Sequence, residues 1–368
     1  MKRVLAGFIM DGRSGGIDKY LLNFLENVRG DDVGIDFLTN EIDPELESYL
    51  RERKSRIFAI ASLKHPVKQY RQVCKIIEQG RYDIVYLNIS TAIDCAAAWA
   101  AKKMHVKRIL LHSHSSGNDI ESVLKRKIFD IIHYICRLTL YRTATEYYGC
   151  SKKAGVWMFP AKIVESPDFS VIFNAVDTGR FQHNVEIREE IRGELRITDQ
   201  FVVGHVGNFV YQKNHFFLID VFEALKKRCP EAILLLVGTG VRFEQVKETV
   251  RKKGLEDSVK LLGFRKDADR LFQGMDFFVL PSNFEGLPTV GVEAQCAGLP
   301  CLMSDTITDE AKITGHCWFL SLKKSPEEWA SFILSHRQEQ DREAVRIGEG
   351  SDYSLEQLKK QQKYLLYQ

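Results

Sequence analysis

Short apolar runs alternate along the chain with longer segments in which apolar residues recur every three or four positions. The runs are rich in valine, isoleucine and leucine, and they predict strands at residues 4–10, 35–38, 57–60, 84–87 and 108–112. The longer segments predict helices near 16–29, 66–79 and 92–103, one or two helices over 119–147, a strand end at 149–150 and a helix over 151–159. Apolar strands separated by helices are typical of a parallel sheet covered on both faces.

The same alternation begins again near residue 200. It predicts strands at residues 201–206, 232–237, 259–262, 277–280 and 300–303, with helices between them. Pro167, Asn174 and a charged stretch interrupt the periodicity between 165 and 200. We therefore predict an α/β chain of two doubly wound, Rossmann-like domains, residues 1–175 and 176–353, facing a central cleft. A final helix over 354–368, with an apolar face of Leu355, Leu358, Tyr364 and Leu365, is expected to return to the first domain.

The composition is that of an ordinary globular protein. The chain has 368 residues, 45% apolar and 27% charged, which is enough to build two cores. A net charge of +3 argues against a dedicated nucleic-acid binder. Residues 1–175 hold 26 Lys and Arg against 20 Asp and Glu, and the remainder holds 26 against 29. This asymmetry indicates an anionic partner for the first half, unless it is chance.

Cysteine usage and hydropathy indicate a cytoplasmic protein. The eight cysteines form no C-x-x-C pair and no zinc-finger spacing, so we expect free thiols, mostly buried. The first apolar run stops at Asp11, which favours a buried strand over a signal peptide. No stretch approaches the roughly 20 apolar residues that span a bilayer. Peripheral association with the inner face of the plasma membrane is compatible with this pattern.

Glycines and a lysine follow the first strand of each predicted domain. Gly15 and Gly16 open a helix, where backbone N–H groups and the helix dipole suit a phosphate, although a tight structural turn explains this loop slightly better when it is taken alone. Lys213 follows strand 201–206 and could neutralise a pyrophosphate, or could simply be a solvated charge. Gly238 ends strand 232–237, another position at which ligands are bound in doubly wound sheets.

Two glutamates stand eight positions apart after strand 277–280. Glu285 lies in the loop, Pro288 suits the first turn of the next helix, and Glu293 lies about one turn into that helix. A carboxylate in an apolar run is costly to bury without partners, and sugar hydroxyls are natural partners for it. The alternative for Glu293 is a favourable interaction with the helix dipole.

Histidines and aspartates provide weaker signals. His112 and His114 end a strand, where a histidine can meet a ligand, but an H-x-H pair lacks a convincing third metal ligand. Asp267 and Asp269 form a D-x-D where a helix should begin, and N-capping explains them better than a metal site.

In their order and spacing, these segments resemble glycosyltransferase family 4, the retaining transferases of GT-B fold, and most closely its capsule and exopolysaccharide branch. The markers extend over nearly the whole chain. They begin at Gly15, Asp83, His112, Gly149, Val171, Gly207, Leu262 and Glu285, and the last of them is an E-x7-E that ends at Glu293.

The resemblance implies a role for each site residue. It places Glu285, His112 and Lys213 at the catalytic centre, with Lys213 on the diphosphate and His112 near the transferred sugar. Phe264 and Arg265 would meet the nucleobase, and Glu293 would bind the ribose hydroxyls. The donor-binding residues as a set would be Gly15, Gly16, Asn208, Lys213, Gly238, Phe264, Arg265, Glu285, Gly286, Leu287, Pro288, Thr289 and Glu293.

The implied reaction transfers a sugar from a nucleoside-diphosphate sugar, UDP before GDP, with retention at the anomeric carbon. The acceptor would be a glycan or an undecaprenyl-linked saccharide, and no metal or other cofactor would be needed. Two positions depart from the family. Asn208 stands where the family usually has arginine, which removes one diphosphate cation unless Arg13 or Arg265 compensates, and Ala175 replaces a glycine.

Three alternatives follow from these residues. The same architecture could carry a nucleotide-sugar epimerase or an inverting transferase. Because of Asn208, the chain could also be a nucleotide-sugar-binding partner subunit with weak or no turnover. A further hypothesis is membrane contact by the first domain, through Lys102, Lys103, Lys107, Arg108 and residues 125–127 ahead of the apolar helix 128–148, although a solvated face explains this pattern equally well.

Overall fold

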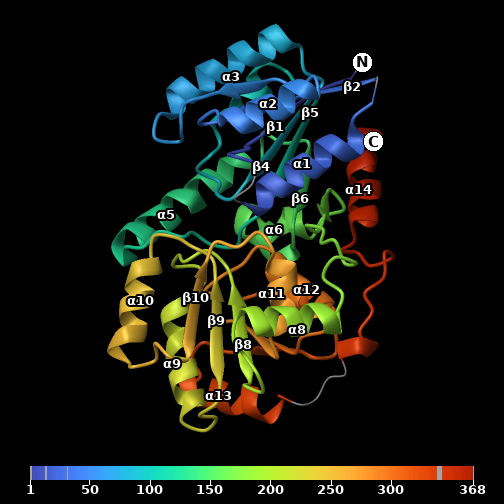
Figure 1. Cartoon of the computed structure of the whole chain (residues 1–368). Helices are drawn as coiled ribbons and strands as arrows, with labels where there is room; N and C mark the ends of the chain where they lie inside the picture. The colour runs from blue at the N-terminus through green and yellow to red at the C-terminus, as the bar shows by residue number, and fades with distance from the viewer. Residues whose placement is uncertain (1, 13–14, 31, 338–341, 368) are drawn as a thin grey trace. The chain divides into compact units, whose positions relative to one another are not determined.

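A computed structural model describes residues 2–12, 15–30, 32–337 and 342–367. The chain divides into two compact units (Figure 1). The first comprises Met1–Ala175 together with Glu356–Gln368, and the second comprises Val176–Leu355. The boundary therefore falls at residue 175, and the last helix belongs to the first unit.

The first unit is built on one parallel sheet of seven strands in the order β3-β2-β1-β4-β5-β6-β7. Because the chain begins near the middle and winds in both directions, the order reverses between β1 and β4. The strands are β1 (Lys2–Gly7), β2 (Val33–Thr39), β3 (Ile57–Ala59), β4 (Ile84–Ile89), β5 (Arg108–Ser113), β6 (Glu146–Gly149) and β7 (Phe169–Val171).

Eight helices cover this sheet in the described part of the first unit. Several begin at side chains that accept a hydrogen bond from the first turn: Asp43 for α2, Ser122 for α5 and Ser151 for α6. The helices are α1 (Gly16–Val28), α2 (Pro44–Glu52), α3 (Pro66–Gly80), α4 (Ala96–Lys103), α5 (Val123–Leu140), α6 (Lys152–Met158), α7 (Ala161–Val164) and α14 (Leu355–Tyr367).

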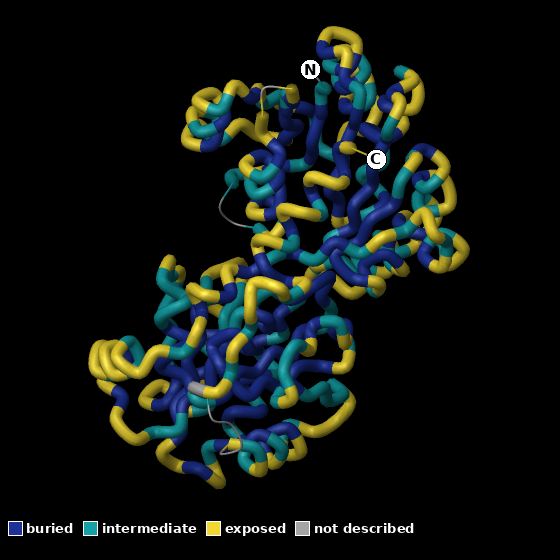
Figure 2. Tube along the Cα trace, turned by 90° about the vertical axis from the view of Figure 1, so that its right-hand side faces the viewer, coloured by how far each residue is buried: buried dark blue, intermediate teal, exposed yellow. Residues whose placement is uncertain are grey.

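Successive side chains along each strand point to opposite faces of the sheet and enter two separate cores. In β1, Val4 and Ala6 pack with Phe24 on one face, and Leu5 packs with Val73 on the other. Both faces are therefore buried, as the continuously apolar strands predict, and the sheet appears as buried tube within each unit in Figure 2.

Helix α14 packs on the first core, but not through the whole face that we predicted. Leu358 and Leu365 are buried, whereas Leu355 and Tyr364 are 41% and 65% exposed. Gln362 is fully buried instead, and its side-chain oxygen accepts a hydrogen bond from Asn27 at 2.8 Å, which offsets the cost of burying the amide. A satisfied amide thus occupies a position that hydropathy alone assigns to solvent.

The second unit repeats the architecture with six parallel strands in the order β10-β9-β8-β11-β12-β13. Its order reverses between β8 and β11. The strands are β8 (Val202–Val206), β9 (Ile233–Val237), β10 (Val259–Gly263), β11 (Phe277–Leu280), β12 (Cys301–Ser304) and β13 (Cys317–Leu320). The α-helices are α8 (Val185–Glu194), α9 (His215–Lys226), α10 (Phe243–Lys252), α11 (Ala268–Gly274), α12 (Thr289–Cys296) and α13 (Pro326–Ser335).

Three predicted segments differ from the structure. Residues 146 and 147 belong to β6 rather than to a helix over 119–147, and helix 92–103 begins only at Ala96. The charged stretch before residue 200 is the helix α8, whose Ile191 alone is fully buried within it. The elements α2, α7, β7 and β13 were not predicted, since each is short or carries few apolar residues.

Two absences concern the described residues. All eight cysteines are free thiols, and five of them are buried, as expected. None of the helices in the described ranges combines the length and apolar character needed to cross a membrane.

Candidate functional site

The second unit places its two most suggestive loops at the point where its strand order reverses. Strands β8 and β11 are neighbours in the sheet, and the loops at their carboxyl ends are residues 207–214 and 281–288. Ligands of doubly wound sheets bind at such a switch point, because the loops there diverge to opposite faces. Lys213 lies in the first loop and Glu285 in the second.

The structure joins Lys213 and Glu285 in a buried ion pair. The Lys213 Nζ atom lies 2.7 Å from Oε1 of Glu285, and the two side chains are 10% and 6% exposed. Two further donors hold the same carboxylate: Ser282 Oγ at 2.8 Å from Oε1 and Gln212 Nε2 at 2.7 Å from Oε2. A carboxylate so surrounded is fixed in orientation, because its position is determined from three directions.

Backbone contacts also fasten the two loops to each other. The Asn283 N–H donates to the carbonyl of Gln212 at 2.7 Å, and its side-chain amide donates to the carbonyl of Tyr211 at 2.7 Å. Just after β12, the Thr306 hydroxyl donates to the carbonyl of Ser282 at 2.6 Å. The site therefore rests on two loops that form one rigid unit.

Gly238 makes room for the first of these loops. It has a φ of +136°, and a Cβ atom there would lie 2.1 Å from the carbonyl oxygen of Gly207. Gly240, with a φ of +154°, approaches Phe209 in the same way. The end of β9 thus packs backbone against backbone on the loop that carries Lys213, and Gly238 supports this loop by its lack of a side chain.

Glu293 and Thr289 lie on α12, which follows the second loop. Pro288 precedes the helix and Thr289 is its first residue, so the positive end of the helix dipole lies at the end of the loop. Glu293 is half-buried. The pKa of Arg180 is raised mainly by Asp269, with which it forms a 2.8 Å ion pair, and also by Glu293. Gly286, Leu287 and Pro288 are buried between Glu285 and the helix.

The predicted nucleobase loop follows β10. Phe264 is 68% exposed there. Arg265 is fully engaged: it forms ion pairs with Asp267 at 2.7 Å and with Glu194 at 2.9 Å, and these partners raise its pKa. Asp267 does precede α11, but its side chain accepts no hydrogen bond from the helix. The capping explanation was therefore wrong, because the carboxylate pairs with Arg265 instead.

Asn208 is exposed in the loop that carries Lys213. Of the two cations considered as substitutes for the family arginine, Arg265 is occupied by acids, and Arg13 lies outside the described residues. Another cation lies beside this loop. The Arg242 guanidinium is 5.3 Å from the ring centre of Tyr211, and the Arg242 N–H donates to the carbonyl of Phe209 at 2.9 Å.

In the first unit, the glycine turn after β1 is held by Asp18. Its buried carboxylate accepts hydrogen bonds from the N–H groups of Met10, Asp11 and Gly12 at 3.0, 3.0 and 2.9 Å, while burial raises its pKa. Gly15 caps α1, and Gly16 begins it. A Cβ atom on Gly16 would lie 3.7 Å from the side-chain amide of Asn174, an ordinary contact distance, so Asn174 borders this helix start.

His112 ends β5 and is fully buried among aromatic rings. Its Nδ1 atom lies 2.7 Å from the Tyr86 hydroxyl, which in turn lies 2.7 Å from that of Tyr20. The ring of His114 is 4.1 Å away, centre to centre. Burial lowers the pKa of His112 well below its usual value and that of His114 to about 3. Both histidines are therefore neutral at physiological pH and can offer hydrogen bonds but not charge.

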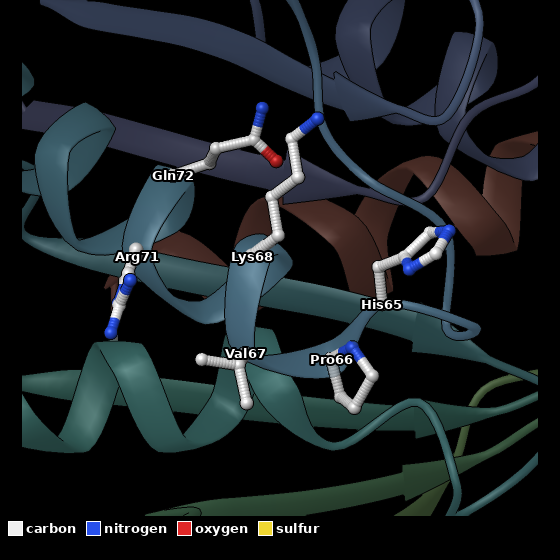
Figure 3. A pocket seen from close by; sticks show the side chains of 6 residues that line it. All are labelled: His65, Pro66, Val67, Lys68, Arg71 and Gln72. Atoms are coloured by element: carbon white, nitrogen blue, oxygen red, sulfur yellow. The ribbon is translucent and has the colours of Figure 1, made fainter.

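Two other features do not coincide with the predicted site. A pocket of about 450 Å³ lies over the first turns of α3, where Lys68 and Gln72 extend to the same side (Figure 3). None of the predicted donor residues lines it. In the parts of the chain that the structure describes, no three His, Cys, Asp or Glu side chains gather as metal ligands.

Sequence reasoning missed the residues that position others. Gln212, Ser282 and Asn283 carried no signal beyond lying near Lys213 and Glu285. The contacts of Gln212 and Asn283 join segments 73 and 72 positions apart, whereas Ser282 bonds to Glu285 within its own loop. Asp18 was more accessible to prediction, because an acid in the first turn of a helix faces the donors of the preceding loop.

Comparison with known proteins gives these loops a context. The family model described as Glycosyl transferases group 1 matches residues 187–346. EpsF of Bacillus subtilis (strain 168), a glycosyltransferase by name, is 30% identical over 343 residues, which cover 90% of this chain and 87% of that protein. An Escherichia coli protein named UDP-Gal:alpha-D-GlcNAc-diphosphoundecaprenol alpha-1,3-galactosyltransferase is 26% identical over 301 residues, with 79% and 76% covered.

A solved structure provides the comparison of fold. Anabaena HepE in complex with UDP-glucose superposes with a TM-score of 0.76 at 19% identity, and the match covers 100% of this chain and 99% of that one. At this identity the likeness concerns the fold alone. It confirms the predicted class: two parallel-sheet, Rossmann-like domains of the GT-B type.

Proposed function

Because this chain belongs to the group 1 glycosyltransferases, we propose that it transfers a hexose from a UDP-sugar to a glycan or undecaprenyl-linked saccharide, with retention at the anomeric carbon, as a family 4 enzyme of capsule or exopolysaccharide synthesis. Support comes from the names of its relatives. The Escherichia coli relative is named for UDP-Gal and a diphosphoundecaprenol-linked acceptor, and HepE was solved with UDP-glucose.

The observation that carries this proposal is the Lys213–Glu285 pair at the switch point between β8 and β11. An ammonium group has three donors, of which Glu285 takes one. The remaining donors can meet the diphosphate as the bond from the anomeric carbon to its oxygen breaks and negative charge grows on the leaving group. The N–H groups that open α12 reinforce this stabilisation.

Glu285 then acts on the sugar rather than on the phosphate. Its carboxylate is held in a fixed direction by Gln212 and Ser282, and in this orientation it would accept from a sugar hydroxyl. Glu293, one turn into α12, would accept from the ribose hydroxyls. In the first unit, Gly15 and Gly16 would offer backbone donors and His112 a neutral hydrogen-bonding group.

The proposed reaction needs no metal, because side chains supply the positive charge. Arg242 would replace the cation that is missing at Asn208, since its guanidinium lies over the Tyr211 ring and its backbone N–H donates to Phe209 in the loop that carries Lys213. In turnover assays Arg242→Gln should therefore be impaired at least tenfold, and adding Asn208→Arg should restore part of the loss. If Arg242→Gln has no effect on turnover, the role proposed for Arg242 is wrong, whereas the assignment of the donor site is unaffected.

A thermal-shift titration tests the donor site. UDP and UDP-sugars should raise the melting temperature with EDTA present, because a ligand that binds only the folded state stabilises it. Glu293→Ala should reduce the shift, and Glu244→Ala, an exposed acid on α10 of the same unit, should not. No shift with UDP, GDP, ADP or CMP would overturn the site assignment.

One alternative rests on a specific observation. Asn208, exposed where the family usually has a cation, favours a binding subunit with weak or no turnover. Such a protein would give the full UDP shift but release no UDP in the presence of any lipid-linked saccharide. An epimerase would instead convert the UDP-sugar without an acceptor.

A further inference from the structure

Helix α5 of the first unit has its polar and apolar faces reversed relative to an ordinary surface helix. Only His133 and Leu140 are buried along its 18 residues. The ridge that faces outward carries Leu124, Ile128, Ile131, Ile135 and Leu138, each between 50% and 70% exposed. Their spacing of four, three, four and three positions sets them in one continuous apolar stripe.

Polar side chains hold the opposite face of α5 to the domain. The His133 ring stacks on Trp157 at 3.8 Å between ring centres, accepts from the Ala92 N–H at 3.1 Å and contacts the Trp157 carbonyl at 3.0 Å. Asp130 accepts from Asn118, and Arg137 donates to the Phe159 carbonyl. The orientation of the helix is therefore fixed by directional contacts, and the apolar stripe is exposed as a consequence of how the helix is attached.

The charges beside the stripe are of one sign. Lys125 and Lys127 are the exposed charged residues of α5, whose every residue the structure describes, and they flank the stripe on both sides. At the other end of the helix, exposed Lys102 donates to the carbonyl of exposed Arg142 at 2.5 Å. Arg108 does not contribute, because Glu146 binds it through two hydrogen bonds of 2.6 and 2.7 Å.

From this arrangement we propose that α5 docks the protein on a lipid bilayer rich in anionic headgroups. The apolar stripe enters the boundary between headgroups and acyl chains, while Lys125 and Lys127 extend to the phosphates on either side. A second copy of the chain is a poorer occupant. Pairing two α5 stripes would bring lysines of like charge beside the seam, without an exposed acid on the helix to meet them.

The inference goes beyond the proposed function and is independent of it. It gives the enzyme a surface at which a lipid-linked acceptor would be encountered, but docking itself involves no sugar. Membrane binding and donor binding can therefore fail separately, and the UDP thermal shift reports whether a variant of α5 is folded and competent to bind its donor.

Vesicle flotation of the full chain tests the proposal. We expect binding to phosphatidylcholine vesicles with 30% phosphatidylglycerol (roughly the anionic content needed for electrostatic attraction) and little binding to phosphatidylcholine alone. Ile131→Ser with Ile135→Ser should weaken binding at least tenfold, because two isoleucine side chains that the bilayer would bury are lost. The matched control is Val67→Ser with Val241→Ser, which removes two valines that are also more than 60% exposed, outside α5.

The lysines test the electrostatic part. Lys125→Gln and Lys127→Gln should each lower affinity for anionic vesicles by about fivefold and reduce its dependence on salt. Failure of the wild-type chain to float with anionic vesicles at low salt would overturn the proposal. So would equal binding by the isoleucine variant and the wild type. A dimer in sedimentation velocity that Ile131→Ser with Ile135→Ser dissolves, without vesicle binding, would assign the stripe to a second copy instead.

Discussion

The ion pair between Lys213 and Glu285 allows a quantitative test of how the donor site is built. At 2.7 Å, two unit charges attract by about 6 kcal/mol when the effective dielectric constant is about 20. Desolvation of the two buried groups offsets much of this attraction, so the net contribution is small, whereas removal of one partner strands the other. We therefore expect each single variant to cost about 3–5 kcal/mol of unfolding free energy.

The surrounding contacts predict which variant costs more. In Lys213→Met the Glu285 carboxylate keeps Gln212 and Ser282, so the loss should be near 3 kcal/mol, the lower end of that range. In Glu285→Gln the ammonium of Lys213 remains buried beside a neutral amide, and the loss should be larger. The double variant should be less destabilised than the sum of the two by about 2–3 kcal/mol.

Guanidinium unfolding of the full chain, followed by circular dichroism, measures this coupling. The control is an exposed pair of equal length: Lys360 Nζ lies 2.7 Å from Glu356 Oε1, with the side chains 66% and 51% exposed. The cycle of Lys360→Met and Glu356→Gln should give a coupling below about 0.5 kcal/mol. A buried coupling no larger than the exposed one would refute the reasoning that burial makes this pair a rigid unit.

Two further predictions concern packing and pH. In the same unfolding assay, Gly238→Ala should lower the unfolding free energy by about 3 kcal/mol, because the new Cβ atom would meet the backbone of Gly207. The control is Gly254→Ala, at a φ of +64° with open space around it, which should cost about 1 kcal/mol. Equal losses in the two variants would contradict the packing argument. Burial lowers the pKa of His215 from its usual 6.5 to about 2. The stability that the neutral side chain contributes is therefore complete above about pH 6.5 and is lost as the pH falls from 6.5 toward 2. His215→Phe should therefore flatten the decline of unfolding free energy between pH 6 and 4 by up to about 1.4 kcal/mol per unit, and an unchanged slope would show that the histidine does not titrate on unfolding.

The strands and the two-domain order were predictable because they depend on local composition. A strand buried on both faces is apolar at nearly every position, as β9 is. The segments that failed are those in which local composition and tertiary environment disagree. Tyr147 and Tyr148 extend a helical pattern, yet they form β6 because the edge of β5 offers them backbone partners.

Residue types and spacing also identified the candidate chemistry. Lys213 and Glu285 follow strands, a glycine turn follows β1, and these positions are fixed by chain order alone. What the sequence could not supply is which of them meet. Lys213 and Glu285 are 72 positions apart, and their contact exists because β8 and β11 are neighbours across the point where the sheet reverses.

The sequence by itself therefore determined the class of fold and the candidate residues for chemistry, since both depend on the period and the identity of side chains along the chain. Only the tertiary structure decided how those residues are used. It sequestered Arg265 with two acids, enclosed Lys213 with Glu285, and turned the apolar stripe of α5 outward. These outcomes depend on pairing between distant segments, and hydropathy along the chain contains no information about which distant partner a side chain will find.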